Sequence, residues 1–312
     1  MASNPTLKQL KYLCAVAERR HFGKAAQSCF VTQSTLSAGV QELEQALGTP
    51  LLERGNKTIL LTAAGEKVVA RGIKILTEIQ AMKEEAASSS EPLSNQIKLG
   101  AIPTIAPFLL PHPLAQLRKD YPKLQLLIRE DQSENLVNLL HQGELDLIVL
   151  AFPYPTGSTH IHHLFYDSFL LAYPDHHKLG RQATIRPQDL KAQEFLLLEQ
   201  GHCLRNHILD ACKLVDSQVS VTFEATSLHT IVPMIANGVG ITLLPAMAVD
   251  AGILSSVSGM STAEFAEPYR GRIRREIGLA WRKNSPREKD YLILANYLVR
   301  QSHKLTGSEI RQ

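Results

Sequence analysis

Apolar residues recur at helical spacing through the first third of the chain. A first amphipathic helix is predicted by five small or apolar residues three and four positions apart: Leu7, Leu10, Leu13, Cys14 and Ala17. Residues 23–29 fit a short second helix, and Phe30 and Val31 fit a tight turn. Thr32 is a good N-cap for a third helix over 33–47, which Gly48 ends.

A short hairpin and a long helix are predicted next. The apolar stretches 51–54 and 58–61 flank the turn residues Gly55, Asn56 and Lys57, which is the pattern of a β-hairpin wing. Thr62 caps a helix reaching to about Ala87, and its apolar stripe requires a partner helix. Residues 86–92 are small, polar and end in proline, which is typical of a linker.

After this linker the pattern changes to strands alternating with helices. Strands are predicted at 97–102, 124–130, 145–152, 169–173, 195–198, 219–224, 240–244 and 277–281. Helices are predicted at 104–120, 133–142, 203–215, 228–237 and 286–304. The alternation favours an α/β domain with mostly parallel sheets in two lobes, about 95–165 with 270–305 and about 166–269. A ligand would bind between the lobes, at the carboxyl ends of strands.

Composition narrows the class of protein. The 312 residues are 44% hydrophobic and 20% charged, as in an ordinary globular protein of two domains. No apolar run is long enough for a membrane helix and the N-terminus has no secretory signal, so we expect a cytoplasmic protein whose cysteines are thiols. Residues 1–90 hold 11 Lys and Arg against 8 Asp and Glu, which accounts for the whole formal excess of +3. An anionic partner is therefore expected to bind the N-terminal part of the chain.

Three short helices followed by a wing form a winged helix-turn-helix, although periodicity alone fits a generic three-helix bundle almost as well. The third helix begins with small polar side chains suited to a DNA major groove, namely Thr32, Gln33, Ser34, Thr35 and Ser37. Arg54 in the wing is placed to meet the DNA backbone or the minor groove.

The same stretch resembles the LysR-type transcriptional regulators. The resemblance rests on Phe22–Ala26, Val31–Ser37, Leu51–Arg54 and Leu61–Gly65, and Ser34 stands where most members carry proline. It implies a winged helix-turn-helix DNA-binding domain at 1–62, a dimerisation helix at 63–90 and a two-lobed, periplasmic-binding-protein-like effector domain at 91–312, α+β overall. It also implies a homo-oligomer, with a tetramer as a dimer of dimers, and RNA polymerase as a partner.

Two cysteines in the effector domain carry the candidate chemistry. Cys203 follows an apolar strand at the start of a helix, next to His202 and close to Arg205, a setting that lowers a thiol pKa. Cys212 comes nine residues later. In a helix their Cα atoms would be about 13 Å apart, at ~1.5 Å rise per residue, whereas a disulfide needs roughly 7 Å or less. Forming that bond must therefore unwind the segment, which is a redox switch.

The segment Gly201–Arg205 with Cys212 resembles the peroxide-sensing members of the LysR-type family. The resemblance implies that hydrogen peroxide oxidises Cys203, the peroxidatic cysteine, to a sulfenic acid, which Cys212 resolves to a disulfide. It implies a peroxide pocket of Thr104, Ser133, His202 and Arg205. Ser133 replaces the usual threonine, and Asn206 stands where the motif often has aspartate, so peroxide sensitivity is expected to differ from the family norm.

Other groups of residues favour plainer interpretations. His160, His162 and His163 lie close together, but no cysteine or carboxylate is at a ligand spacing, so we expect surface histidines, no metal and no cofactor. Arg270, Arg272, Arg274 and Arg275 form a basic run interpreted as a solvated edge. Cys14 and Cys29 are interpreted as small core residues.

Three functions remain in competition. A peroxide-responsive transcription factor acting on double-stranded DNA is favoured over a LysR-type regulator that senses a metabolite between its lobes. A thiol peroxidase is disfavoured, because the Pro and Thr expected before the nucleophile of a peroxiredoxin are missing. The sequence does not identify the operator, the target genes or the direction of regulation.

Overall fold

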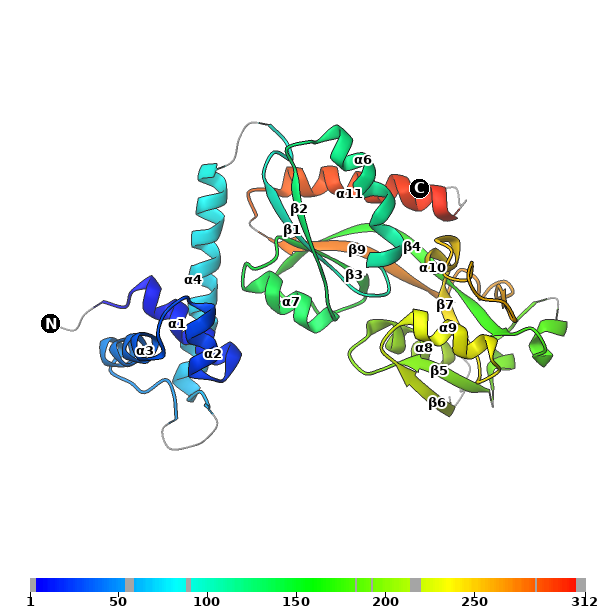
Figure 1. Ribbon diagram of the computed structural model, residues 1–312, viewed down its shortest axis with the longest axis horizontal. Coiled ribbons are helices and arrows are strands. Elements are labelled where there is room, and N and C mark those ends of the chain that lie inside the picture. The colour runs from blue at the N-terminus through cyan, green and yellow to red at the C-terminus, as the bar shows by residue number, and fades with distance from the viewer. Residues whose placement is uncertain are drawn as a thin grey trace. The chain divides into compact units, whose positions relative to one another are not determined.

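The computed structural model describes residues 4–53, 59–87, 91–182, 184–191, 193–213, 220–283 and 285–306. Its internal contacts divide the chain into two units (Figure 1): residues 1–87 with 141–143, and residues 88–140 with 144–312. Within the described residues, no helix combines the length and the apolar character that a bilayer crossing requires.

The first unit is helical. Its helices are α1 (Leu7–Arg19), α2 (Phe22–Ser28), α3 (Gln33–Leu47) and α4 (Ala63–Ala87). Leu13, Val16, Leu36 and Leu43 are fully buried between them. Of the stripe that predicted the first helix, Leu10 and Leu13 are buried, whereas Leu7 is exposed. Thr32 caps α3 and Gly48 ends it with φ 67°, as predicted.

The wing is described only at its base. Leu52 and Leu61 form an antiparallel bridge, and the Glu53 amide donates to the Leu60 carbonyl at 2.9 Å. Residues 54–58, which include Arg54, lie outside the described residues, so the tip of the hairpin remains a prediction.

The second unit is built on sheets. Its strands are β1 (Gln96–Ala101), β2 (Gln125–Glu130), β3 (Leu147–Phe152), β4 (Thr159–Pro174), β5 (Glu194–Leu198), β6 (Ser220–Ala225), β7 (Thr242–Pro245), β8 (Met260–Ala263) and β9 (Arg274–Arg282). Its α-helices are α5 (Ala106–Leu109), α6 (Pro111–Asp120), α7 (Ser133–His141), α8 (Cys203–Lys213), α9 (Leu228–Ala236), α10 (Ala246–Asp250) and α11 (Glu288–Thr306). Two 3-10 helices cover Lys178–Arg181 and Pro187–Leu190.

The prediction of mostly parallel sheets is wrong. The larger sheet has the order β2-β1-β3-β9-β4-β7 with β8 beside β4, and β5 pairs with β6 in a separate two-stranded sheet. Only β1–β2, β1–β3 and β5–β6 are parallel among the named strands. The reason is that β9 comes from late in the chain and inserts between β3 and β4, antiparallel to both.

Strand β4 connects the two halves of this unit. Its first part, from Thr159 to Ser168, pairs with β9, and its last part, from Phe169 to Pro174, pairs with β7 and β8. The prediction of a strand at 169–173 found only the second part, because His160, His162 and His163 broke the apolar pattern of the first part. The predicted helix at 104–120 is two helices, interrupted at Leu110 before Pro111.

Gly65 illustrates how closely the wing base packs on α4. A Cβ added there would lie 2.1 Å from the Leu51 carbonyl oxygen, which is backbone and has no room to move, whereas a Cβ at Gly271 would meet nothing within 4 Å.

We therefore expect Gly65→Ala to destabilise the first unit by about 1–3 kcal/mol, the usual range for an overpacked site. Urea denaturation of the full chain, followed by circular dichroism, measures this change. The matched control, Gly271→Ala, should leave the free energy of unfolding within about 0.5 kcal/mol of the wild type. Equal effects of the two substitutions would contradict the packing at Gly65.

Candidate functional site

Cys203 is the first residue of α8 and lies at the centre of the candidate site. It follows β5 and a turn at Gly201, and only 6% of its surface is exposed. The groups around its thiol come from the α7 N-terminus (Ser133), the end of β3 (Ala151) and β9 (Arg275). The thiol therefore lies at the carboxyl end of β3, where the sequence placed the ligand site.

Gly201, in the turn before Cys203, has a backbone conformation that side chains rarely adopt. Its φ is 98°, and a Cβ there would lie 2.4 Å from the side-chain oxygen of Gln132, next to Ser133. The Gln132 side chain is flexible and could move aside, so the left-handed backbone, rather than the space, is what requires glycine at position 201.

The prediction that the Cys203 pKa is lowered is wrong. Burial raises the pKa of the thiol, and Arg275, the Ser133 hydroxyl and the backbone of Ala151 and Leu204 oppose that rise without overcoming it. Neutral thiol is the form this dry environment favours. The same four groups would stabilise a thiolate once it forms.

Arg275 is the cation that acts on this thiol, and sequence reasoning missed it. The side chain is fully buried and paired with Asp167 of β4, with Nη2 and Nε 2.9 and 3.0 Å from its Oδ2. It also donates from Nη1 to the Thr104 hydroxyl and from Nη2 to the Thr104 carbonyl, both at 2.9 Å. The interpretation of this position as a solvated edge is therefore wrong, because β9 alternates and turns Arg275 inward while Arg274 stays exposed over the Tyr166 ring.

The structure places Arg205 outside this group. Its Nη1 donates to the Leu198 carbonyl at 3.1 Å and to Glu224 at 2.6 Å, so the side chain ties α8 to β5 and β6. His202 is buried next to Cys203, and burial lowers the pKa of its imidazole. The sequence predicted that both residues stabilise a Cys203 thiolate. In the structure Arg205 is bonded to Leu198 and Glu224 instead, and His202 favours its neutral form.

Two buried polar atoms in this region have no partner. The Ser133 hydroxyl and the His207 Nδ1 are inaccessible to water and, among the described residues, make no hydrogen bond of good geometry. Ser133 lies against the Cys203 thiol, and Arg275 lies close enough to His207 to help burial lower the pKa of that imidazole to about 4. Buried polar groups are normally satisfied, so an unsatisfied hydroxyl beside a thiol is a place where a small polar ligand could bind.

Cys212 lies on the same helix as Cys203. The backbone is helical from Cys203 to Lys213, which confirms the predicted helix over both cysteines. The two Cα atoms are thus about 13 Å apart, at ~1.5 Å rise per residue. Among the residues with described side chains, Cys14, Cys29 and Cys203 are free thiols.

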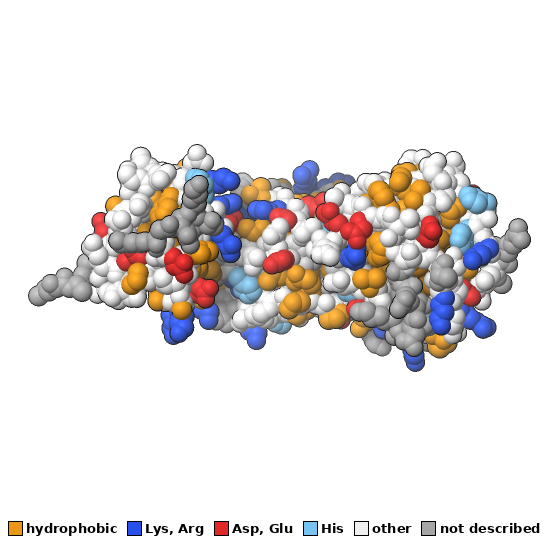
Figure 2. Space-filling view, turned by 90° about the horizontal axis from the view of Figure 1, so that it is seen from below, with side chains coloured by type: hydrophobic (Ala, Val, Ile, Leu, Met, Phe, Trp, Pro, Cys, Tyr) orange, Lys and Arg blue, Asp and Glu red, His pale blue; other side chains and the backbone are white. Residues whose placement is uncertain are grey.

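The N-terminus of α3 is the candidate DNA contact. Thr32 accepts a hydrogen bond from the Thr35 amide at 3.2 Å, and its hydroxyl also bonds those of Ser34 and Thr35 at 3.0 and 2.8 Å. Thr32, Gln33, Ser34 and Thr35 are exposed and Ser37 is half-buried. On the face shown in Figure 2, Lys and Arg side chains lie among acidic and uncharged ones.

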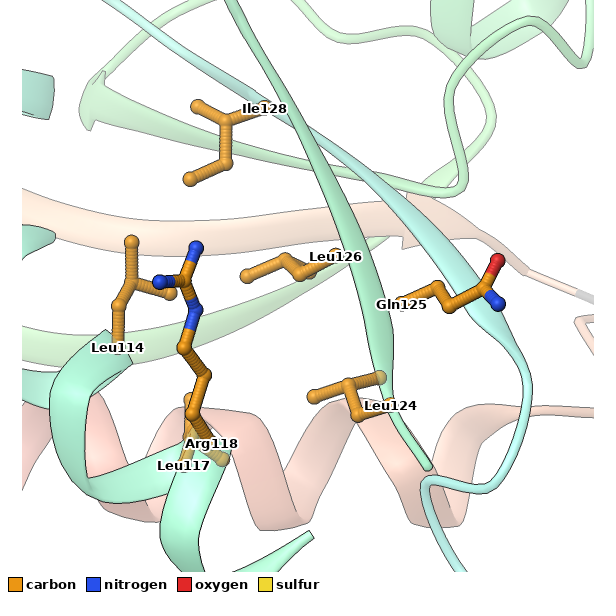
Figure 3. Close-up of a pocket in the computed structure, with 7 residues that line it drawn as sticks. All are labelled: Leu114, Leu117, Arg118, Leu124, Gln125, Leu126 and Ile128. Atoms are coloured by element: carbon orange, nitrogen blue, oxygen red, sulfur yellow. The ribbon is translucent and has the colours of Figure 1, made fainter. Parts of the chain in front are cut away.

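The remaining candidates contribute no chemistry to this site. His163 bonds Glu276 at 3.1 Å and the His160 ring lies 4.6 Å from that of Trp281. The part of the chain that the structure describes contains no group of three His, Cys, Asp or Glu residues able to hold a metal ion. A surface pocket of about 240 Å³ lies between α6 and β2 (Figure 3) and has no thiol in its lining, which is Leu114, Leu117, Arg118, Leu124, Gln125, Leu126 and Ile128.

Comparisons with known proteins identify both units. Residues 7–66 match the family described as bacterial regulatory helix-turn-helix protein, lysR family, and residues 90–302 match the LysR substrate binding domain. The chain is 38% identical to the HTH-type transcriptional regulator EstR of Acinetobacter baylyi over 96% of this chain and 98% of that one. It is 37% identical to the DNA-binding transcriptional dual regulator OxyR of Escherichia coli K12, over 93% of each chain.

Solved structures of OxyR proteins also match this chain. A full-length OxyR from Pseudomonas aeruginosa, with a cysteine replaced by aspartate, matches with a TM-score of 0.74 and 34% identity over 95% of each chain. An OxyR cysteine variant from Corynebacterium glutamicum, described as hydrogen peroxide-bound, matches with a TM-score of 0.65 and 30% identity over 98% of this chain and 96% of that one.

Because Arg275 and not Arg205 lowers the thiol pKa, the two arginines should differ in their effect on Cys203. We expect Arg275→Met to slow alkylation of Cys203 by iodoacetamide at pH 8 about tenfold, because loss of the cation raises the thiol pKa further and leaves less thiolate to react. In the wild type the rate should still be rising between pH 7 and pH 9, because the pKa lies above the ordinary thiol value. Peptide mass mapping after timed alkylation measures both effects.

Arg205→Met is the matched control and should alkylate Cys203 at nearly the wild-type rate. Circular dichroism must show that both variants are folded, since an unpaired buried Asp167 can cost about 3–5 kcal/mol. A folded Arg205→Met variant that slowed alkylation more than Arg275→Met would contradict the assignment.

Proposed function

The chain belongs to the LysR family of bacterial transcriptional regulators, and we propose that it responds to hydrogen peroxide through oxidation of Cys203. The observation that carries this proposal is a buried free thiol at a helix N-terminus that lies beside a buried guanidinium and an unsatisfied hydroxyl. Relatives named OxyR, and a structural neighbour described as peroxide-bound, support it. Like its family, the chain is a regulator and not an enzyme.

The proposed pocket uses Thr104, Ser133, His202 and Arg275, with Arg205 holding the start of α8 in place. Peroxide would accept a hydrogen bond from the Ser133 hydroxyl, which lies against the Cys203 thiol and, among the described residues, has no other partner. Arg275 already donates to Thr104 and so fixes that hydroxyl within the pocket. Neutral His202 can donate or accept a hydrogen bond, which suits a ligand with two O–H groups.

The oxidation step is a displacement at peroxide oxygen. The Cys203 thiol loses its proton, and the thiolate sulfur attacks one oxygen while the O–O bond breaks. The leaving hydroxide takes up a proton, so one thiol and one peroxide give a sulfenic acid and one water, with sulfur oxidised and peroxide reduced. Arg275 favours the thiolate that attacks, and burial favours the neutral thiol.

The second step would be attack by Cys212 on the sulfenic acid, which forms the disulfide and releases water. Since α8 holds the two Cα atoms about 13 Å apart and a disulfide allows roughly 7 Å at most, α8 must unwind for this bond to form. Unwinding would release Arg205 from Glu224 and Leu198. The covalent change thus becomes a change of conformation.

The output is a change in DNA binding. We propose that α3 enters the major groove with Thr32, Gln33, Ser34, Thr35 and Ser37, that Arg54 contacts the backbone or minor groove, and that α4 pairs two chains within a tetramer. Unwinding of α8 would alter how the subunits hold two half-sites, and RNA polymerase would respond to that change.

Micromolar peroxide should convert the wild-type chain to a form with a Cys203–Cys212 disulfide. Intact mass should fall by about 2 Da, as two thiol hydrogens are lost, and non-reducing peptide mapping should find the linked pair. The Cys212→Ala variant should stop at a sulfenic acid that a dimedone probe captures at Cys203.

The Cys203→Ser variant is the control for sulfur chemistry and should lose both the disulfide and the transcriptional response. A normal peroxide response in that variant would exclude Cys203 as the sensor. Thermal stabilisation of Cys203→Ala by a metabolite would instead favour a regulator that binds a ligand between its lobes.

A further inference from the structure

Phe30 occupies an unusual position in the turn between α2 and α3. Helix α2 ends in a Schellman motif: the Val31 amide donates to the Ala26 carbonyl at 3.0 Å and the Phe30 amide donates to the Gln27 carbonyl at 3.1 Å. This motif requires a left-handed residue between Cys29 and Val31. That residue is Phe30, with φ 57°.

Glycine or asparagine is the usual residue at this position, because a side chain in left-handed backbone brings Cβ close to the carbonyl oxygen. A bulky aromatic residue is a genuine exception. The apolar contact that normally accompanies the motif is already made by Val31, which packs on the core of the first unit. The ring of Phe30 is therefore not needed to end α2.

The Phe30 ring does not contribute to the buried core either. Phe30 is 93% exposed, the highest value among the large apolar side chains of the described chain. The folded unit thus keeps a phenyl ring in water and in unfavourable backbone, although a smaller residue would suit the site better. Strained residues of this kind cluster at functional sites, so the Phe30 ring is a candidate for a function other than folding.

Phe30 lies two residues before the N-cap of α3. The first turn of α3 exposes Gln33, Ser34 and Thr35, the end of a recognition helix that approaches base edges. Gln33 and Ser34 can read hydrogen-bond donors and acceptors, and among the three only Thr35 also carries a methyl group. The apolar group that the major groove displays is the thymine C5 methyl.

We propose that Phe30 is a specificity-determining DNA contact whose ring packs against a thymine methyl group in the half-site that α3 reads. The inference rests on DNA binding by α3 and is independent of the peroxide chemistry of Cys203. It can therefore fail while the redox proposal stands, and the reverse also holds.

The test uses the full chain and a duplex selected from a random-sequence pool by the wild-type protein. Phe30→Gly should weaken binding to this duplex about tenfold, the low end of the cost of one mismatched base pair. The slope of log affinity against log salt should not change, because no phosphate contact is lost. The Tm should stay equal or rise, since glycine relieves the left-handed backbone. Phe30→Asn, which also tolerates this backbone, should behave alike.

Base substitution then locates the contact. Each thymine of the half-site is replaced by deoxyuridine in turn, which removes only the methyl group. At one position the wild type should lose affinity while Phe30→Gly loses none, so the two changes are not additive. The matched control is Leu47→Ala, which removes an exposed apolar side chain at the other end of α3. Leu47 lies about 21 Å along the helix axis from Gln33, at ~1.5 Å rise per residue. It should bind like the wild type.

Three results would overturn the proposal. Unchanged affinity of Phe30→Gly and Phe30→Asn would exclude a DNA contact. A lower Tm in both variants would show that the ring stabilises the fold. Additive losses at every deoxyuridine position would exclude the thymine methyl as the group contacted.

Discussion

The pairing of Arg275 with Asp167 is the interaction on which the candidate site depends. Both side chains are fully buried, and their contacts join β9, β4 and the turn after β1 at one point. The Asp167 carboxylate also accepts the Met247 amide at the start of α10, at 3.0 Å. A charge buried this deeply is tolerated only when it is paired and hydrogen-bonded, so the position of the guanidinium is fixed by the whole domain.

That fixed cation determines what the neighbouring groups can do. Arg275 lowers the pKa of Cys203 against the opposing effect of burial, and it helps burial lower the pKa of His207. The site thus favours a neutral thiol and a neutral imidazole beside the buried Arg275–Asp167 ion pair. The thiolate and not the thiol is the nucleophile, so the reactivity of Cys203 depends on the balance between burial and the Arg275 cation. Helix α8 adds a second constraint, because its geometry keeps Cys203 and Cys212 apart.

Local sequence signals predicted the elements that carry the site. The Thr32 cap, the end of α3 at Gly48 and the start of α8 at Cys203 follow from residues within a few positions of each feature. These features depend on capping and on helical periodicity, which a single sequence displays. The relation between Cys203 and Cys212 was predictable for the same reason, since both lie on one helix.

What the sequence did not reveal depends on contacts between distant segments. Arg275 looked like part of an exposed basic run because the residues around it are charged, and only the pairing of β9 with β4 turns it toward Asp167. Arg205 looked like the partner of the thiol because it is two residues away, yet Glu224 and Leu198 hold it elsewhere. The strained backbone of Phe30 was also hidden, because no local pattern marks an aromatic residue in a left-handed turn.

The central claim is that a disulfide and a wound α8 exclude each other. Amide hydrogen exchange over residues 203–213, measured by mass spectrometry on the reduced chain and the peroxide-treated chain, tests it most directly. The account predicts slow exchange in the reduced form and a rise of at least about tenfold, or 1.4 kcal/mol, once the sulfurs are joined. Equal protection in both forms, with the Cys203–Cys212 bond verified in the same sample, would contradict it.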